Sequence, residues 1–316
     1  MRRRRLGSSE LSTAPIVFGG NVFGWTVDEK TAFDLLDAFL DGGLNMIDTA
    51  DTYTRWAPGA KGGESESIIG AWMKARGNRH KVIVATKVGM EMGPREKGLS
   101  RRWILAAVED SLKRLQTDYI DLYQAHRDDE SAPQEETAAA FAELVKSGKV
   151  RVLGASNFSG ARLLSALRVS ESHGLPRYQT LQPHYNLYER AAFEADAQPV
   201  CVEEGVSVIP YFPLASGFLS GKYRSEADLS KSKRGGGMTK FMNPRGFRIL
   251  DALDLVAKRM HATPAQVALA WLMQRPAVTA PIASATSRAQ VEDLVKAAEL
   301  ALDRDAREAL DRASAP

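Results

Sequence analysis

The chain has 316 residues, of which 44% are hydrophobic and 26% charged, and its formal net charge is +3. This length suits two average domains or one α/β barrel, and the composition is that of a soluble globular enzyme. The small charge argues against a nucleic-acid partner, and no apolar run reaches the roughly 18 residues that a membrane span needs. The single cysteine, Cys201, rules out an intrachain disulfide and a cysteine-based metal cluster, so we expect no metal and a reducing, cytoplasmic setting.

A basic run, residues 2–5, opens the chain and precedes Leu6–Leu11, which we interpret as a turn between two short strands. A targeting or nucleic-acid-binding arm is the alternative, but such arms normally accompany a wider basic patch. No apolar segment follows that would make a secretory signal. We therefore expect a short N-terminal β-hairpin whose arginines lie on a solvated face.

Strands and helices then alternate along the chain. This alternation predicts a parallel sheet covered by helices, either open or closed. No Gly-x-Gly-x-x-Gly follows a predicted strand, where an open dinucleotide-binding sheet would need it. We therefore expect residues 1–316 to form one domain, a (β/α)8 TIM barrel. The predicted strands are 16–19, 44–48, 82–86, 119–125, 150–154, 178–182, 206–209 and 278–282, and the clearest helices lie at 29–41, 64–75, 100–115, 134–146 and 160–171.

Four polar residues follow the ends of neighbouring predicted strands. Asp48 ends the second strand, and Tyr53 lies in the loop after it. Lys87 and His126 follow the next two strands, each 39 residues further along the chain. Because parallel strands point their carboxyl ends at the same rim, we expect these four residues, here called the tetrad, to be neighbours. Each alone is usually a surface or structural group, but together they indicate a catalytic site.

The tetrad predicts a proton relay. A phenol has a pKa of about 10, and a cation within about 4–6 Å lowers it. Asp48 would hold Lys87, Lys87 would lower the pKa of Tyr53, and His126 would orient a carbonyl. Such a site suits the protonation of an oxygen whose carbon receives a hydride, which only a cofactor supplies. The rival hypothesis is an aldolase in which Lys87 forms a Schiff base, which leaves Tyr53 without a task.

One connection is unusually long. Residues 211–247 follow the seventh predicted strand and are rich in Gly, Ser and Lys. Loops of this length in a compact domain are usually functional lids or disordered segments. We expect a lid that becomes ordered on a phosphate-bearing ligand, since backbone amides and lysines suit a pyrophosphate. A mobile surface loop without a ligand is the alternative.

Several motifs in order resemble the aldo-keto reductase family over nearly the whole chain. The tetrad matches the family's Asp-Tyr-Lys-His tetrad residue by residue, in order and spacing. Further segments are similar to family motifs at residues 47–53, 154–157, 181–186 and 211–223. The resemblance implies a (β/α)8 fold and NAD(P)H-dependent reduction of an aldehyde or ketone, with Tyr53 as general acid. Because the family also includes channel-associated relatives, an NADPH-binding sensor with little turnover is an alternative.

The same resemblance implies the cofactor contacts. Ser156, Asn157 and Gln182 would bond the nicotinamide carboxamide, and Tyr211 would stack on the ring. Residues along the pyrophosphate would be Leu214, Ser216, Gly217 and Lys222, and residues at the adenine end would be Ser284, Thr286 and Arg288.

The adenine end departs from the family pattern. No lysine lies in residues 282–290, where many members carry one, and Leu294 stands where an asparagine would meet the adenine. Arg288 would bind a 2′-phosphate, since a guanidinium suits phosphate geometry, and we therefore expect NADPH rather than NADH.

Loop residues beside the tetrad are the expected substrate contacts, namely Trp25, Trp56 and Arg127, with Asp129 nearby. Small aldehydes, ketones, sugars and larger hydroxylated metabolites all fit the sequence, and the sequence does not specify an oligomeric state.

Overall fold

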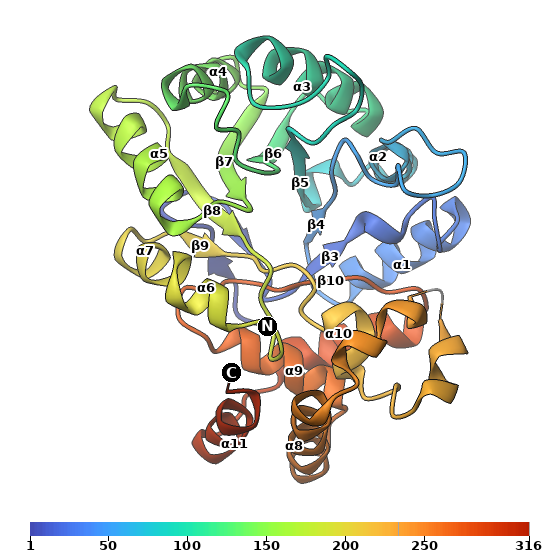
Figure 1. Cartoon of the computed structure of the whole chain (residues 1–316). Coiled ribbons are helices and arrows are strands. Elements are labelled where there is room, and N and C mark those ends of the chain that lie inside the picture. The colour runs from blue at the N-terminus through green and yellow to red at the C-terminus, as the bar shows by residue number, and fades with distance from the viewer. Residues whose placement is uncertain (233, 316) are drawn as a thin grey trace.

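Eight parallel strands lie at the centre of the computed structural model, which describes residues 1–232 and 234–315 (Figure 1). The strands neighbour one another in the order β10-β3-β4-β5-β6-β7-β8-β9. Their bounds are β3 (Val17–Gly19), β4 (Met46–Asp48), β5 (Ile83–Val88), β6 (Ile120–Ala125), β7 (Val150–Ser156), β8 (Tyr178–Gln182), β9 (Ser207–Val208) and β10 (Ile282–Ala283).

The two ends of this sheet meet just before β10. Val208 of β9 forms a parallel bridge with Val278. The Val208 amide donates to the Ala277 carbonyl, and the Thr279 amide donates to the Val208 carbonyl, both at 2.8 Å. This contact closes the ring, and the predicted (β/α)8 TIM barrel is confirmed. The eighth strand is shorter than predicted, because regular pairing with β3 begins only at Ile282.

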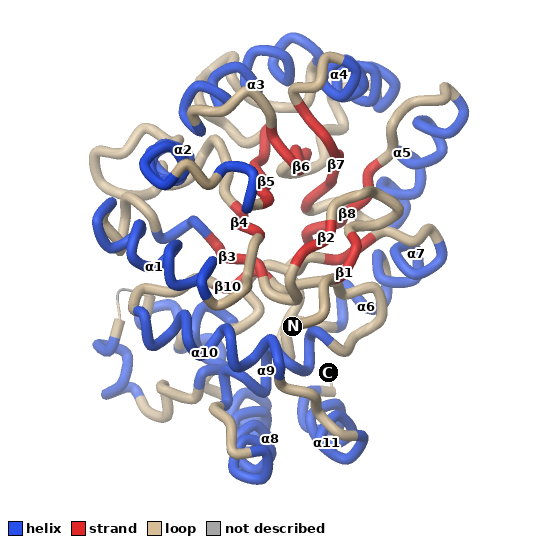
Figure 2. Tube along the Cα trace, turned by 180° about the vertical axis from the view of Figure 1, so that it is seen from behind, coloured by secondary structure: helices blue, strands red, loops and turns tan. Residues whose placement is uncertain are grey.

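A short hairpin covers the amino-terminal end of the barrel. It consists of β1 (Arg4–Arg5) and β2 (Ser12–Thr13), as predicted (Figure 2). Its Leu6 and Leu11 are buried in a cluster with strand-start residues such as Met46, which stabilises the closure by roughly 1.5–3 kcal/mol for each leucine. Arg4 departs from the expected solvated face, because its guanidinium donates to the carbonyls of Met273 and Thr279 at 2.9 and 3.1 Å.

Capping side chains mark where several helices begin. Asp28, Ser100 and Ser159 each accept a hydrogen bond from the backbone amide three residues further on, which satisfies an orphan donor of the first turn. The predicted helices therefore lie within one or two residues of the observed ones. The helices of the first five units are α1 (Glu29–Asp41), α2 (Glu64–Arg76), α3 (Arg101–Leu115), α4 (Gln134–Lys146) and α5 (Gly160–Ser172).

The chain after β8 is more helical than expected. The predicted loop 211–247 contains four short 3₁₀ turns, and its last residues already belong to α8, which Asn243 caps. Short 3₁₀ turns have no apolar period, so the sequence pattern does not reveal them. The α-helices and 3₁₀ turns that follow β8 are α6 (Ala191–Ala195), α7 (Ala197–Glu203), η3 (Ala215–Ser220), η4 (Glu226–Lys231), η5 (Gly235–Gly237), η6 (Thr239–Phe241), α8 (Pro244–Met260), α9 (Pro264–Met273), α10 (Arg288–Glu299) and α11 (Arg304–Ser314).

Candidate active site

The tetrad meets at the carboxyl ends of β4, β5 and β6. Asp48 is the last residue of β4, Lys87 lies near the end of β5, and His126 follows β6 directly. The Lys87 ammonium donates to the Asp48 carboxylate at 2.7 Å and to the Tyr53 hydroxyl at 3.1 Å. It also donates to the Thr49 carbonyl at 2.7 Å. Because Tyr53 accepts from Lys87, its own hydroxyl proton is free to be donated to a ligand.

The electrostatics around Lys87 keep it charged. Burial lowers the pKa of Lys87, but the attraction of Asp48 and Tyr53 outweighs burial, and the pKa is raised overall. The ammonium is also fully hydrogen-bonded and has no exposed surface. A protonated amine has no lone pair with which to attack a carbonyl, so this environment disfavours a Schiff-base role.

The pKa of Tyr53 shifts in the opposite direction from the one predicted. Burial raises it more than the neighbouring Lys87 lowers it, and the charge of Asp48 raises it further. The expectation of a lowered pKa was wrong, because it counted the cation and not the loss of water around the phenol. Tyr53 is therefore held in the protonated form, which is the form that a general acid needs.

His126 completes the rim of the site. Its ring lies edge-on to Tyr53 with 6.0 Å between the centroids. Burial, with repulsion from Lys87 and Arg127, lowers the pKa of His126 well below its usual value. Its Nδ1 is buried and has no hydrogen-bond partner among the described residues. The imidazole is thus neutral at pH 7 and can donate one hydrogen bond to a carbonyl oxygen.

A hydrogen-bond network joins the tetrad to the expected carboxamide site. Gln182 donates to the second Asp48 oxygen at 2.8 Å, and Ser156 donates to the Gln182 carbonyl at 2.9 Å. Asn157 donates to the His126 carbonyl at 2.9 Å and accepts from the Tyr211 hydroxyl at 2.8 Å. The three predicted carboxamide contacts therefore lie together beside the tetrad.

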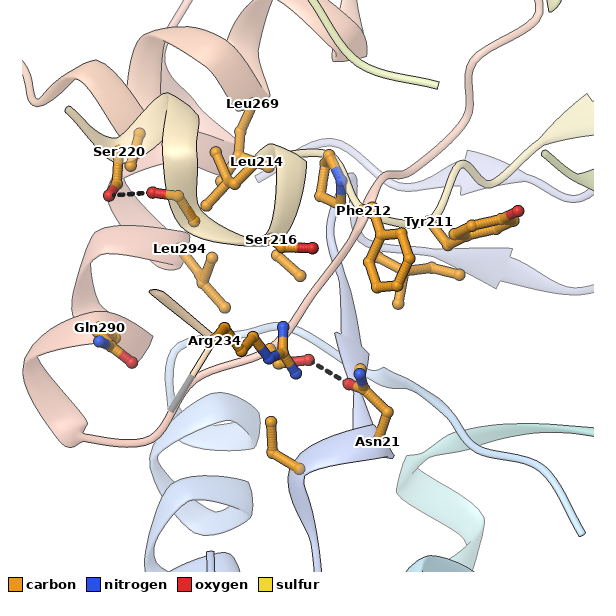
Figure 3. A pocket seen from close by; sticks show the side chains of 18 of the residues that line it. Asn21, Tyr211, Phe212, Leu214, Ser216, Ser220, Arg234, Leu269, Gln290 and Leu294 are labelled. Carbon is orange, nitrogen blue, oxygen red and sulfur yellow. Dashed lines mark hydrogen bonds between the residues drawn. The ribbon is translucent and has the colours of Figure 1, made fainter. Parts of the chain in front are cut away.

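A cavity of about 920 Å³ extends from the tetrad along η3 to α10 (Figure 3). This volume is at the upper end of the range for small-molecule and cofactor sites. Gln290, Asp293 and Leu294 line its far end, beside the start of α9. The lining includes most of the predicted cofactor contacts, namely Ser156, Asn157, Gln182, Tyr211, Leu214, Ser216, Gly217, Lys222, Ser284 and Thr286.

Three of the predicted cofactor and substrate contacts lie outside this lining. Arg288 is exposed and forms an ion pair with Asp34 of α1. Arg127 is exposed next to His126. Trp25 packs edge-on against Trp56, which does line the cavity.

Arg234 lines the cavity, although the sequence did not identify it (Figure 3). Its guanidinium lies 5.3 Å from the centroid of the Trp25 ring. With Lys222, it brings a second cation to a cavity with many hydrogen-bonding groups. The only signal in the sequence was its place in a basic, glycine-rich segment, which does not show which side chain points inward.

The part of the chain that the structure describes contains neither a cluster of metal-ligating side chains nor a helix that could span a membrane. No three or more His, Cys, Asp or Glu side chains are grouped so that they could hold a metal ion within residues 1–232 and 234–315. In the same residues, every helix is too short or too polar to pass through a bilayer.

Comparison with known proteins identifies the family of this chain. The sequence model of the Aldo/keto reductase family matches residues 15–315. The chain is 38% identical to the uncharacterized oxidoreductase YrpG of Bacillus subtilis over 308 residues, which are 95% of this chain and 92% of that protein. It is 35% identical to the aldo-keto reductase YhdN of the same organism, covering 91% of this chain and 84% of that one. A probable voltage-gated potassium channel subunit beta of Arabidopsis thaliana is 32% identical, with 95% and 92% covered. The chain therefore belongs to the aldo/keto reductase family, as its sequence motifs predicted.

Proposed function

We propose that this oxidoreductase reduces an aldehyde or ketone to an alcohol with NADPH, and that Tyr53 is the general acid. The observation that carries the proposal is the Lys87 ammonium, placed between the Asp48 carboxylate and the Tyr53 hydroxyl at 2.7 and 3.1 Å. Family membership supports an oxidoreductase that reduces carbonyl groups. The assignment of roles to individual residues is our own.

The proposed proton step uses only side chains of the tetrad. Tyr53 gives its proton to the carbonyl oxygen, and the ammonium of Lys87 stabilises the phenolate that remains. Asp48 keeps Lys87 charged and in place. Neutral His126 donates a hydrogen bond to the same carbonyl oxygen, which fixes its orientation and stabilises the negative charge that develops there.

The cavity supports a dinucleotide ligand. Amide side chains and Tyr211 lie at the tetrad end, and Lys222 and Arg234 contribute two cations further along. Ser156, Asn157 and Gln182 would hold the carboxamide, with Tyr211 under the ring. When bound, the reduced nicotinamide supplies the hydride, which no side chain can provide.

The proposal of NADPH over NADH rests on different residues from those the sequence suggested. Arg288 pairs with Asp34 outside the cavity, whereas Arg234 and Lys222 line it. A 2′-phosphate adds two negative charges that need cations, and a guanidinium matches its geometry. We assign binding of the 2′-phosphate to Arg234 and Lys222, with Ser284 and Thr286 as polar contacts at the adenosine end.

The substrate side of the site is aromatic. Trp56 and Phe212 both line the cavity and remain 49% and 42% exposed, which is unusual for such large apolar side chains. Trp56 is held edge-on by Tyr53 at 5.5 Å and by Trp25 at 6.1 Å. We propose that this wall takes carbonyl compounds with a flat apolar ring. Arg127, exposed outside the lining, would contact only the outer part of a larger substrate.

A sensor that binds NADPH with little turnover is the second candidate, and the similarity to a potassium channel subunit beta favours it. Steady-state assays separate the two. The wild-type protein is titrated with NADPH and with NADH by nucleotide fluorescence, and then mixed with a panel of aromatic and aliphatic aldehydes while absorbance is followed. We expect tighter binding of NADPH and carbonyl-dependent oxidation over many turnovers. Binding without turnover on any substrate would favour the sensor.

A further inference from the structure

A second group of ionisable side chains lies behind the tetrad, between strands β5 and β6 and helices α2 and α3. It consists of Asp51, Glu66, Arg114 and Tyr123, here called the buried acid cluster. Asp51 follows β4, Glu66 belongs to α2, Arg114 to α3 and Tyr123 to β6. The carboxyl groups and the phenol have almost no exposed surface. None of these residues has a role in the proposed reaction.

The hydrogen bonds of this cluster leave Asp51 without a partner. Glu66 accepts from Arg114 at 2.6 Å and from the Thr86 hydroxyl at 2.5 Å, so both of its oxygens are satisfied. Both carboxyl oxygens of Asp51 and the hydroxyl of Tyr123 are buried without a hydrogen-bond partner of good geometry among the described residues, and the adjacent Thr52 backbone amide offers Asp51 only a weak contact. One arginine thus faces two acids and is bonded to only one of them.

We propose that Asp51 holds a proton in the folded protein and acts as a positioning residue, whose charge state sets how readily Tyr53 gives up its own proton. The part of this proposal that concerns Tyr53 rests on the proposed carbonyl reduction. The part that concerns the proton on Asp51 does not.

Charge and burial support the proton on Asp51. A carboxylate removed from water without a donor or cation is strongly disfavoured, and such a group takes up a proton instead. Burial, together with the charge of Glu66, raises the pKa of Asp51 to about 8, against the opposing effects of Arg114, the Thr52 backbone amide and Lys87.

The other ionisable groups around the cluster do not supply a better partner. Asp110 of α3 adds a further negative charge that acts on Arg114 and Tyr123. Burial raises the pKa of Tyr123 well above its usual value, so this phenol keeps its proton. A neutral Asp51 beside a neutral Tyr123 is therefore the arrangement that these groups favour.

Asp51 is also connected to the tetrad. It lies between Asp48 and Tyr53 in sequence, and its backbone amide donates to the Lys87 carbonyl at 3.3 Å. A negative charge on Asp51 raises the pKa of Tyr53. Loss of the Asp51 proton would therefore make the Tyr53 phenolate harder to form. That phenolate is the base that alcohol oxidation, the reverse reaction, requires.

The first test measures the proton directly and needs no activity. Infrared spectra of wild type and Asp51→Asn are compared between pH 6 and pH 10. We expect a protonated-carboxyl band in wild type at pH 7 that disappears at alkaline pH and is missing from the variant. Asp110→Asn, a change at an exposed acid of α3, is the matched control and should keep the band. A wild-type spectrum without the band at pH 7 would overturn the proposal.

The pH dependence of folding stability also tests whether Asp51 holds a proton. An unfolded aspartate loses its proton near pH 4, whereas folded Asp51 keeps it up to about pH 8. Wild type therefore loses stability as pH rises through this window, and the loss levels off above it. Asp51→Asn escapes the loss, so its melting temperature should exceed that of wild type by a margin that grows from pH 5 to pH 8. A variant that melts below wild type at pH 8 would mean that Asp51 is charged and needed in that form.

The second test concerns the coupling to Tyr53. The pH profile of alcohol oxidation with NADP⁺ is recorded for wild type, Asp51→Asn and Asp110→Asn. In Asp51→Asn, the rising alkaline limb should move to lower pH by roughly one unit, the effect of one buried charge at moderate range. An effect through packing alone would change the rate and leave the limb where it is, and that result would overturn the positioning role. A wild type without turnover would instead refute the proposed function, and the infrared test would still decide the proton on Asp51.

Discussion

The guanidinium of Arg234 lies 5.3 Å from the ring centroid of Trp25 and so joins the segment after η4 to the loop after β3. A cation over an indole is attracted by the ring's electron-rich face. The contact holds the Arg234 guanidinium at the cavity, where we propose that it meets an anion. It therefore links the proposed phosphate site to the aromatic wall of the proposed substrate site.

Replacing Arg234 should weaken NADPH binding. In Arg234→Met, the loss of a charge-assisted hydrogen bond of about 1.5–3 kcal/mol corresponds to a rise in Kd of roughly tenfold or more. Arg288→Met is the matched control, because Arg288 pairs with Asp34 outside the cavity, and its Kd should stay within about twofold. Fluorescence titration measures both values. A large loss in Arg288→Met with none in Arg234→Met would restore the assignment made from the sequence.

Asp48→Asn should damage both stability and turnover. The amide keeps the shape of the side chain but leaves the ammonium of Lys87 buried without its counter-charge, which costs about 3–5 kcal/mol. Turnover should fall by roughly 10²-fold or more as the proton relay loses its anchor. Urea denaturation compares this variant with Glu143→Gln, whose solvent-exposed pair with Arg101 is expected to contribute little to stability. Equal stability of the two variants would show that the buried pair is not a stabilising contact.

Carbonyl reduction should not respond to pH near neutrality. Tyr53 has a raised pKa and stays protonated, and His126 has a lowered pKa and stays neutral, so neither changes its state between about pH 6 and 7, below the range in which Asp51 loses its proton. The value of kcat/KM should be flat over this range. An inflection near pH 6.5 that disappears in His126→Asn would mean that the imidazole titrates like an ordinary exposed histidine.

The pH dependence of folding stability should also reflect the lowered pKa of His126. The unfolded histidine binds a proton below about pH 6.5 that the buried imidazole does not bind, so wild type gains stability as pH rises toward 6.5. His126→Asn should lack this part of the slope in thermal denaturation.

Trp56→Ala should change substrate preference. Removal of the half-exposed indole takes away a stacking surface, so kcat/KM for an aromatic aldehyde should fall by roughly tenfold, while a two- or three-carbon aldehyde is little affected. Val202→Ala, at an exposed apolar residue of α7, controls for loss of surface hydrophobicity. An equal loss for aromatic and small aldehydes would assign Trp56 to support of Tyr53 rather than to substrate binding.

Parallel topology explains why the site could be located from sequence. Asp48, Lys87 and His126 lie at or just beyond the carboxyl ends of three successive strands, at equal spacing, and closing the barrel brings them together. The helices were predictable for a similar reason, since Asp28 and Ser100 mark the starts of amphipathic stretches. Strand ends and helix caps are local features of the sequence, and a regular fold repeats them along the chain.

The sequence-based predictions that the structure corrected depend on burial or on irregular chain paths. The direction of the Tyr53 pKa shift depends on how much water is removed from the phenol, which no spacing reveals. Arg234 lies in a basic, glycine-rich segment and Arg288 at the start of α10, and neither setting reveals that the first side chain lines the cavity while the second meets Asp34. The isolation of Asp51 likewise results from the packing of α2 and α3 around it.

The most direct test of the account is turnover of NADPH with an aromatic aldehyde by wild type and Tyr53→Phe, with NADPH binding measured on both. The variant removes a single hydroxyl, 3.1 Å from the Lys87 ammonium, and leaves the ring in place. We predict that Tyr53→Phe loses at least roughly 10²-fold in turnover while its Kd for NADPH stays within a few-fold of wild type. Equal turnover by the two proteins would show that the proton comes from elsewhere and would contradict the account.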